Sequence, residues 1–305
     1  MYNNKLYIIK TLSNLHVGGS DENYSIVDKQ VQKDNLTGYP TVHASSFKGA
    51  MREYIKNLEV NKQDLKQDGS AAEGMADAGD GIIYTVFGQE PKSDSTNQKK
   101  AKAGHVIFSE PKLLSLPVRT SEKSFMHAIC PKLIEMYNDT SEVYELSSYI
   151  KEFTADDIGY YCAEDDFTGE LVAEEYSFKL NRNEALSVLE DYIGKNVILL
   201  SNSQFEVIAK ALPVIARNHL ENGESKNLFY EEVVPREATF YVTLQYPNDK
   251  IMSMEPRDNK SQKNINGFAK NIENIKFYLG ANTSIGYGLC ELKQISPDVE
   301  EKDNG

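Results

Sequence analysis

The chain has 305 residues, with 33 lysines and arginines against 46 aspartates and glutamates, a formal net charge of -13 at pH 7. Hydrophobic residues make up 40% and charged residues 26% of the sequence, which is typical of a globular protein of one or two domains and excludes a chain that is disordered throughout. The first residues lack the apolar run of a signal peptide, and no window approaches the roughly 18 apolar residues of a membrane span. We therefore expect a cytoplasmic protein without a membrane partner.

The cysteines and the distribution of charge narrow the functional classes further. Cys130, Cys162 and Cys290 are isolated and odd in number, which excludes a disulfide framework and a Cys-x-x-Cys zinc site. Most of the acidic excess falls between residues 135 and 191, so the rest of the chain is close to neutral and carries local basic stretches. The net charge therefore does not exclude a nucleic-acid partner. We expect 135–191 to be an acidic insertion, either a solvated face or a docking face for a basic subunit.

The first hundred residues predict one strand and one helix. Residues 5–12 are rich in β-branched and aromatic side chains, which is typical of a strand. Apolar residues recur with helical spacing over 44–58, so we predict an amphipathic helix that is capped by Ser45 or Ser46. Two further stretches are small, polar and aperiodic, which predicts mobile insertions at 61–80 and 88–104.

The rest of the chain alternates short strands with helices. Asn222-Gly223 between two apolar runs predicts a long exposed β-hairpin over 214–234. Ser203-Gln-Phe-Glu206 has the capping-box pattern of a helix that would run to Leu212, and Pro131 suits the first turn of another helix. The remaining predicted elements are strands at 104–109, 112–118, 171–180 and 238–246, a helix at 264–276 and a last strand that ends near Ile295. This order favours an α+β core of β-α-β type decorated by loops.

A candidate phosphate site lies at the start of the predicted helix over 44–58. Hydroxyl groups, free backbone N–H groups and two positive charges come together at this helix N-terminus, and they belong to Ser45, Ser46, Lys48 and Arg52. Helix N-termini of this kind bind phosphate. The same residues also fit an ordinary capped helix with solvated basic side chains. The segment by itself does not separate these interpretations.

Glycines cluster near the C-terminus, at Gly280, Gly286 and Gly288. Their order is the reverse of the dinucleotide-binding fingerprint and they precede a strand, so a dinucleotide site is excluded. A glycine cluster allows a close backbone approach, here to an RNA strand or to the helix over 46–58, although a plain strand-loop-strand also fits. His16 and Asp28 lie in a loop after the first strand without a partner at metal-ligand spacing, so each alone fits a turn residue or a solvated charge.

The order of these segments resembles the RAMP superfamily of CRISPR proteins, over most of the chain. The resemblance rests on Leu15-His-Val-Gly-Gly19, Ile26-Val-Asp-Lys-Gln-Val-Gln32, Thr37-Gly-Tyr-Pro40, His43-Ala-Ser-Ser-Phe-Lys-Gly-Ala-Met-Arg52, Leu116-Pro-Val-Arg-Thr120, Ala128-Ile-Cys-Pro131, Leu228-Phe-Tyr-Glu-Glu-Val-Val-Pro235 and Gly280-Ala-Asn-Thr-Ser-Ile-Gly-Tyr-Gly-Leu-Cys290. The sequence is similar to one branch of the family, the fourth Cmr subunits, which are the backbone proteins of type III-B effector complexes.

The resemblance implies an architecture and a set of partners. It implies a single RAMP domain over 1–305, an α+β fold with a modified RRM-like (ferredoxin-like) palm, finger-type insertions over 61–104 and a β-hairpin thumb over 213–235. Several copies would stack along a CRISPR RNA beside other Cmr subunits, and the thumbs would distort the guide-target duplex. The chain would then be a metal-dependent endoribonuclease that cleaves complementary single-stranded target RNA.

The resemblance assigns Asp28 to this chemistry, and the other candidates follow from their positions in the sequence. Asp28 is the expected carboxylate that acts as a base or holds a weakly bound Mg²⁺ or Mn²⁺, and His16 and Glu231 are further catalytic candidates. The expected RNA-binding residues are Ser45, Ser46, Lys48, Arg52, Asn282, Thr283, Ser284, Gly286 and Gly288. Two alternatives stay open: a non-catalytic RNA-binding filament subunit, and an acidic scaffold protein that does not bind RNA.

Overall fold

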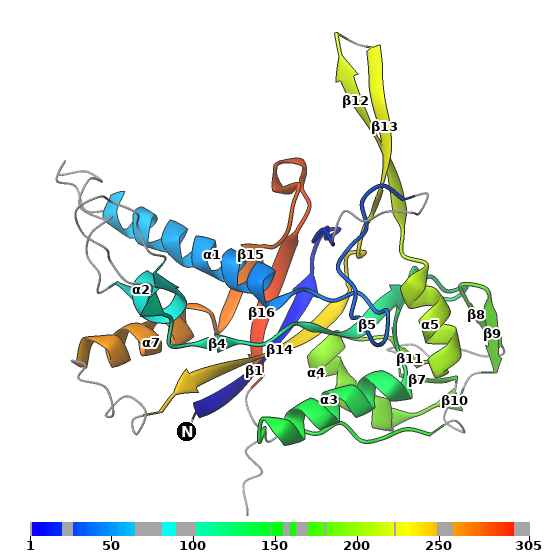
Figure 1. Ribbon diagram of the computed structural model, residues 1–305. Helices are drawn as coiled ribbons and strands as arrows, with labels where there is room; N and C mark the ends of the chain where they lie inside the picture. The colour runs from blue at the N-terminus through cyan, green and yellow to red at the C-terminus, as the bar shows by residue number, and fades with distance from the viewer. Residues whose placement is uncertain are drawn as a thin grey trace, which may run out of the picture.

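The structure is a computed structural model that describes residues 2–19, 27–64, 81–89, 102–146, 148–154, 159–162, 170–179, 181–222, 224–248 and 259–295. These residues form a mixed α/β fold around one long sheet (Figure 1). Its strands lie in the order β10-β7-β11-β6-β5-β14-β1-β16-β15, and β4 also pairs with β14. Among the described helices, none combines the length and the apolar character that a membrane span requires.

β1 is an interior strand of this sheet and pairs antiparallel with β14 on one side and with β16 on the other. Its residues Leu6, Tyr7, Ile8 and Ile9 are all buried, which is typical of a strand covered on both faces. The strand predicted at 5–12 is confirmed and starts earlier. The sheet strands are β1 (Tyr2–Thr11), β4 (Ile107–Phe108), β5 (Lys112–Val118), β6 (Met126–Ile129), β7 (Tyr160–Cys162), β10 (Asn181–Arg182), β11 (Val197–Leu199), β14 (Thr239–Pro247), β15 (Asn274–Tyr278) and β16 (Leu289–Ile295).

Three helices, α1 (Ala44–Asp64), α2 (Ile82–Phe87) and α7 (Asn259–Asn271), pack on one face of the sheet through an aromatic cluster. The rings of Phe47, Phe87 and Phe268 each contact Phe108 of β4, with centroid distances between 5.5 and 6.1 Å. Because one helix contributes each of the first three rings, this cluster fixes the helical layer against the sheet.

The described part of the insertion predicted over 61–104 forms regular secondary structure and is not an irregular loop. Residues 61–64 belong to α1, and α2 lies in the core with Val86 and Phe87 buried. β2 (Gly88–Gln89) and β3 (Lys102–Ala103) form a separate two-stranded sheet. Residues 65–80 and 90–101, where the rest of the insertions was predicted, lie outside the described residues.

The acidic segment 135–191, which the sequence predicts to be an insertion, contributes to the sheet and the core through its described residues. It begins inside α3 (Pro131–Val143), which has Pro131 in its first turn as predicted. α3 lies on the face opposite to the aromatic cluster, where the Tyr137 ring is 5.2 Å from that of Tyr241. β7 and β10 extend the sheet, and η2 (Glu184–Leu189) and α4 (Glu190–Ile193) bury Leu186, Leu189 and Ile193.

The boundaries of several other elements differ from the prediction. The strand at 171–180 is instead a hairpin of β8 (Glu170–Ala173) and β9 (Tyr176–Lys179), because Glu174 has a positive φ of 50° and reverses the chain. The helix predicted at 264–276 ends at Asn271, and residues 274–276 belong to β15, whose Ile275 and Phe277 alternate with exposed residues.

The first residues of two helices also differ from the prediction. α5 (Asn202–Lys210) begins before the predicted box, because Ser201 caps it: the Ser201 hydroxyl accepts from Gln204 N at 3.2 Å, and Gln204 Oε1 accepts from Ser201 N at 3.0 Å. α1 begins at Ala44, so Ser45 and Ser46 lie in its first turn and do not occupy the N-cap position.

Candidate nucleic-acid interface

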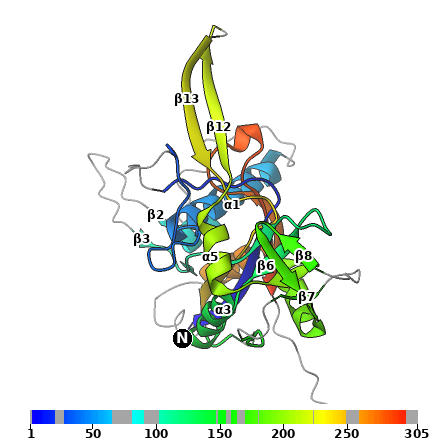
Figure 2. The ribbon, with the colours of Figure 1, turned by 90° about the vertical axis from the view of Figure 1, so that its right-hand side faces the viewer.

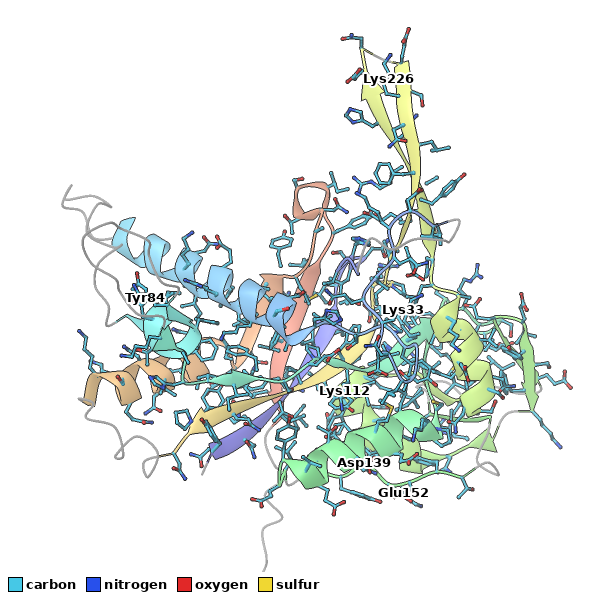
Figure 3. All side chains as sticks on the ribbon, in the orientation of Figure 1. Lys33, Tyr84, Lys112, Asp139, Glu152 and Lys226 are labelled. Carbon is cyan, nitrogen blue, oxygen red and sulfur yellow. The ribbon has the colours of Figure 1, made fainter. Side chains whose placement is uncertain are left out.

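A β-hairpin stands away from the rest of the described chain in both ribbon views (Figures 1 and 2). It consists of β12 (Val214–Glu221) and β13 (Glu224–Glu232), so the predicted hairpin is confirmed. Most of β13 is exposed, including Leu228 at 55%, and only Glu231 and Glu232 at its base are buried. Lys226 lies near the tip and Lys33 near the base (Figure 3). We call this element the thumb.

Asp28 is held against the base of the thumb by backbone hydrogen bonds. The segment 27–33 runs beside β13, where Lys29 N donates to Tyr230 O at 3.1 Å and Glu232 N donates to Lys29 O at 2.8 Å. Tyr230 N in turn donates to Asp28 Oδ2 at 2.7 Å. Asp28 is nevertheless exposed, so its carboxyl group is both oriented and accessible.

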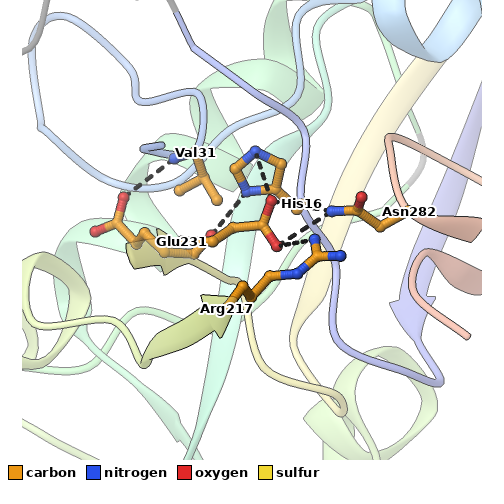
Figure 4. Close-up of polar contacts among 6 residues, drawn as sticks. His16, Val31, Arg217, Glu231 and Asn282 are labelled. Carbon is orange, nitrogen blue, oxygen red and sulfur yellow. Dashed lines mark hydrogen bonds and ion pairs between the residues drawn. The ribbon is translucent and has the colours of Figure 1, made fainter. Parts of the chain in front are cut away.

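Glu231 occupies a different environment, because its carboxylate is buried and paired (Figure 4). Arg217 Nη1 of β12 donates to Glu231 Oε2 at 2.8 Å, and Asn282 Nδ2 donates to Oε1 at 3.0 Å and to Oε2 at 3.1 Å. His16 Nε2 lies 3.8 Å from Oε1. These contacts satisfy the charge and the lone pairs of the carboxylate inside the protein, as a buried ion requires.

His16 is buried beside the same strand. Its Nδ1 lies 2.8 Å from Glu232 O, and because a carbonyl only accepts, Nδ1 carries a proton and donates. Glu232 also anchors the Asp28 segment from the other side of β13, since its carboxylate accepts from Val31 N at 3.1 Å and from Lys33 Nζ at 2.8 Å. Adjacent glutamates therefore face opposite ways, as successive strand residues do.

A groove of about 740 Å³ lies between the first turns of α1 and the loop that joins β15 to β16. Ser45 and Ser46 line one wall, and Thr283 and Ser284 of the short helix η3 (Thr283–Ile285) line the other. Gln32 lies in the floor, where Nε2 donates to Gly18 O at 3.1 Å and to Ser46 Oγ at 3.2 Å. The structure thus brings together four of the predicted RNA-binding residues.

The glycines of this loop allow a close backbone approach, but not to α1. A Cβ on Gly280 would lie 2.4 Å from His16 O, and one on Gly288 would lie 2.1 Å from Leu279 O. Gly286 has no neighbour within 4 Å and a φ of +88°. Two of the glycines therefore serve packing inside the protein, and Gly286 allows the turn itself.

Lys48 and Arg52 lie outside the residues that line the groove, on the adjoining face of α1. The Lys48 ammonium lies 5.8 Å above the Phe108 ring, whereas Arg52 is exposed. Burial, followed by the nearby Arg52 charge, lowers the pKa of Lys48. The four basic and hydroxyl residues therefore do not converge on one point, and Arg52 is the more accessible cation.

Sequence reasoning missed the residues that hold these parts together. The contacts described above are formed by Arg217, Gln32 and Glu232, and none of these was predicted as a site residue. Their partners are between 14 and 201 residues away in the sequence, so no local spacing indicates them. Among the described residues, no group of three or more histidine, cysteine, aspartate or glutamate side chains could hold a metal ion.

Comparison with known proteins decides the family. A model described as the RAMP superfamily matches residues 8–291. The chain belongs to the RAMP superfamily. This RAMP protein is 21% identical over 319 residues to the CRISPR system Cmr endoribonuclease Cmr4 of Pyrococcus furiosus, in an alignment that covers 96% of this chain and 97% of the relative. The family expected from the sequence is confirmed.

Two solved structures share the fold of this RAMP protein. A crystal structure of oligomeric Cmr4 from Pyrococcus furiosus has a TM-score of 0.65 and 18% identity, and covers 97% of this chain and 98% of its own. A cryo-EM structure of the type III-B Cmr-beta complex bound to cognate target RNA has a TM-score of 0.67 and 20% identity, and covers 96% of this chain and 97% of its own. The mixed α/β fold is therefore that of a Cmr4-like RAMP protein.

Proposed function

We propose that this RAMP protein is a backbone subunit of a type III-B CRISPR ribonucleoprotein, which binds CRISPR RNA as a helical filament and cleaves complementary target RNA. The observation that carries the proposal is the position of Asp28, an exposed carboxylate held at the base of a projecting hairpin. The full-length likeness to a relative named a Cmr endoribonuclease supports it. Its partners would be further copies of itself and other Cmr subunits, as in the oligomeric and complexed relatives.

The strand order supports a palm and thumb description of the fold. In chain order β1, α1, β4 with β5, β14, α7 and β16 follow the β-α-β-β-α-β pattern of a ferredoxin-like, or RRM-like, palm. In space β1 lies between β14 and β16, and β14 lies next to β5, which is the arrangement that this pattern gives. The thumb would enter the guide-target duplex, and the groove beside α1 would hold the guide backbone.

The chemistry uses the nucleophile that RNA carries itself. The 2′-oxygen attacks the adjacent phosphorus and the 5′-oxygen leaves, which gives a 2′,3′-cyclic phosphate and a 5′-hydroxyl end. This requires the two oxygens in line with phosphorus, so the duplex must be distorted at the cut. Asp28 would accept the proton of the 2′-hydroxyl, or would orient the groups that do so. His16 is buried, so it would act in proton transfer only through groups that lie between it and the RNA.

The described residues fit only a weakly held metal ion. Asp28 is an exposed carboxylate, and no cluster of three or more histidine, cysteine, aspartate or glutamate side chains that could hold a metal ion is found within the described chain. Mg²⁺ commonly takes one or two carboxylates and completes its shell with water and phosphate oxygens. Asp28 would therefore hold Mg²⁺ or Mn²⁺ only together with RNA, and the ion would stabilise the negative charge that develops on the phosphate.

The experiment that tests this function is to produce the chain with the other subunits of its complex and to analyse the RNA that co-purifies. We expect a short guide RNA, and the complex should cut a complementary RNA at regular intervals. Guide binding should weaken as salt rises, with a slope of roughly 0.7 per phosphate contact for single strands. Binding without cleavage would favour a structural filament subunit, and absence of RNA would favour the scaffold alternative.

Replacing Lys48 and Arg52 together by alanine should weaken guide binding without unfolding α1. The buried face of the helix, Phe47, Met51 and Ile55, is untouched by these changes. We expect the salt slope in each copy to fall by roughly 0.7 for every phosphate that is no longer neutralised, with most of the effect in the single Arg52→Ala variant. Fluorescence anisotropy of a labelled guide at several salt concentrations measures this, and an unchanged slope would remove both residues from the RNA site.

A further inference from the structure

The carboxylate of Glu231 connects three segments that are distant in the sequence. Arg217 binds it from the other thumb strand, Asn282 from the loop between β15 and β16, and His16 approaches from the segment after β1 (Figure 4). Asn282 adopts a left-handed backbone conformation, with φ of 65°, and its Nδ2 faces both carboxylate oxygens. We call Arg217, Glu231 and Asn282 the thumb-base cluster.

The charge balance of this cluster depends mainly on Arg217. Within the described residues, Glu231 has two basic neighbours: Arg217 Nη1 at 2.8 Å and His16 Nε2 at 3.8 Å. A buried carboxylate without its paired cation is strongly destabilised, whereas an uncharged amide of the same shape is not. Since the Asn282 amide is directed at Glu231, it acts on the thumb rather than offering this group to RNA.

The same strand that carries Glu231 also holds Asp28. Three consecutive residues of β13 make separate contacts. Tyr230 N donates to Asp28, and the Glu231 carboxylate accepts from Arg217 and Asn282. The Glu232 carboxylate accepts from Val31 N and Lys33 Nζ. A shift of the thumb base would therefore move Asp28 with it. The loop that contains Asn282 also carries Thr283 and Ser284, which line the groove. The cluster therefore connects the groove that would hold the guide to the strand that holds Asp28.

We infer that Arg217 and Asn282 are positioning residues for RNA cleavage. With Glu231 they fix the thumb base against the groove loop, and so set where Asp28 lies relative to a guide held in the groove. Glu231 acts here as a structural anchor and not as a general base. This inference rests on the proposed function, because it concerns cleavage by the assembled complex.

The test uses the assembled complex with Arg217→Met, Asn282→Ala, Glu231→Gln and the double variant Arg217→Met/Glu231→Gln. Arg217→Met leaves Glu231 buried without its main counter-charge, so the single-turnover cleavage rate should fall at least about tenfold, and cuts should spread to neighbouring positions. Asn282→Ala should also spread the cuts. Guide binding should stay within about twofold in both variants, since the hydroxyl groups and Arg52 are unchanged.

The double variant separates positioning from chemistry. The glutamine side chain introduced by Glu231→Gln would be neutral and would still accept a hydrogen bond from Asn282, so we expect the rate to recover to within about threefold of the unmodified complex. Lys151→Met, which removes one exposed positive charge far from the thumb in sequence, is the control for charge alone.

Each outcome decides the inference. Recovery in the double variant, with regular cuts, supports positioning by charge balance. A double variant that stays as inactive as Glu231→Gln would show that Glu231 is itself catalytic and would overturn the inference. Cleavage at the normal rate and positions in Arg217→Met and Asn282→Ala would also overturn it, while leaving the proposed function intact. An unmodified complex that binds no guide or cuts no target would overturn both.

Discussion

Replacing Asp28 by alanine in every copy should abolish target cleavage while guide and target binding persist. Asp28 is exposed and its Oδ2 accepts from Tyr230 N at the surface, so the substitution affects a loop and not the core. Positioned acid-base groups contribute about 10²- to 10⁴-fold to rates, and we expect the rate to fall by a factor in that range. Single-turnover cleavage of a labelled target, with binding measured in parallel, is the appropriate measurement.

Two matched variants define what this fall in rate means. Asp28→Asn keeps an acceptor for Tyr230 N but removes the charge, so it should be as inactive as alanine. Asp34→Ala removes another loop aspartate, whose Oδ1 accepts from Leu36 N at 3.0 Å and Thr37 N at 2.7 Å, and should cost about 1 kcal/mol of stability with cleavage intact. EDTA should reproduce the Asp28 defect, and products should end in a 2′,3′-cyclic phosphate. Full cleavage by Asp28→Ala, or 3′-hydroxyl ends, would contradict the mechanism.

Shortening the thumb should also abolish regular cleavage, for a geometric reason. Deleting residues 219–227 and joining Asn218 to Leu228 through an Asn-Gly turn keeps the cross-strand pair of Arg217 with Phe229 and everything below it. The described side chains of the deleted part are exposed, so the melting temperature should change little. Without the outer hairpin the duplex should keep its A-form geometry, in which the 2′-oxygen is not in line with the leaving oxygen.

A series of progressively shorter thumbs shows whether the loss of cleavage follows the length of the hairpin. Removing cross-strand pairs one at a time from the tip should reduce cutting progressively, while target binding stays constant or improves. Circular dichroism and thermal melts of each variant check that the rest of the chain stays folded. Cutting at the same positions by the shortest variant would show that the distortion of the duplex comes from another part of the complex.

Elements with a strong local signal could be predicted from the sequence. The Asn222-Gly223 turn, the helical spacing over 44–58 and Pro131 each identified the correct element, because the deciding interactions lie within a few residues. Boundaries failed where two local signals compete. Both Ser201 and Ser203 begin a capping-box pattern, and the choice follows from where β11 ends, at Leu199.

The candidate site was less predictable, because its geometry depends on long-range contacts. Asp28 was identified through a family resemblance, and no spacing in the sequence places it beside Tyr230, which is 202 residues away. Glu231 and Glu232 are two adjacent acids at the end of a strand, yet both are buried. Their counter-ions, Arg217 and Lys33, lie on different elements, so only the folded chain shows why two adjacent acids are tolerated there.

The position of β1 in the sheet has a consequence for synthesis of the chain. β1 is made well before its two partners, β14 and β16, which begin at residues 239 and 289. The strand therefore lacks both partners until those segments have emerged from the ribosome, and during that interval its apolar side chains are open to misfolding and to binding by chaperones. A nascent chain thus completes the pairing of β1 only once β16, which ends at Ile295, has been made.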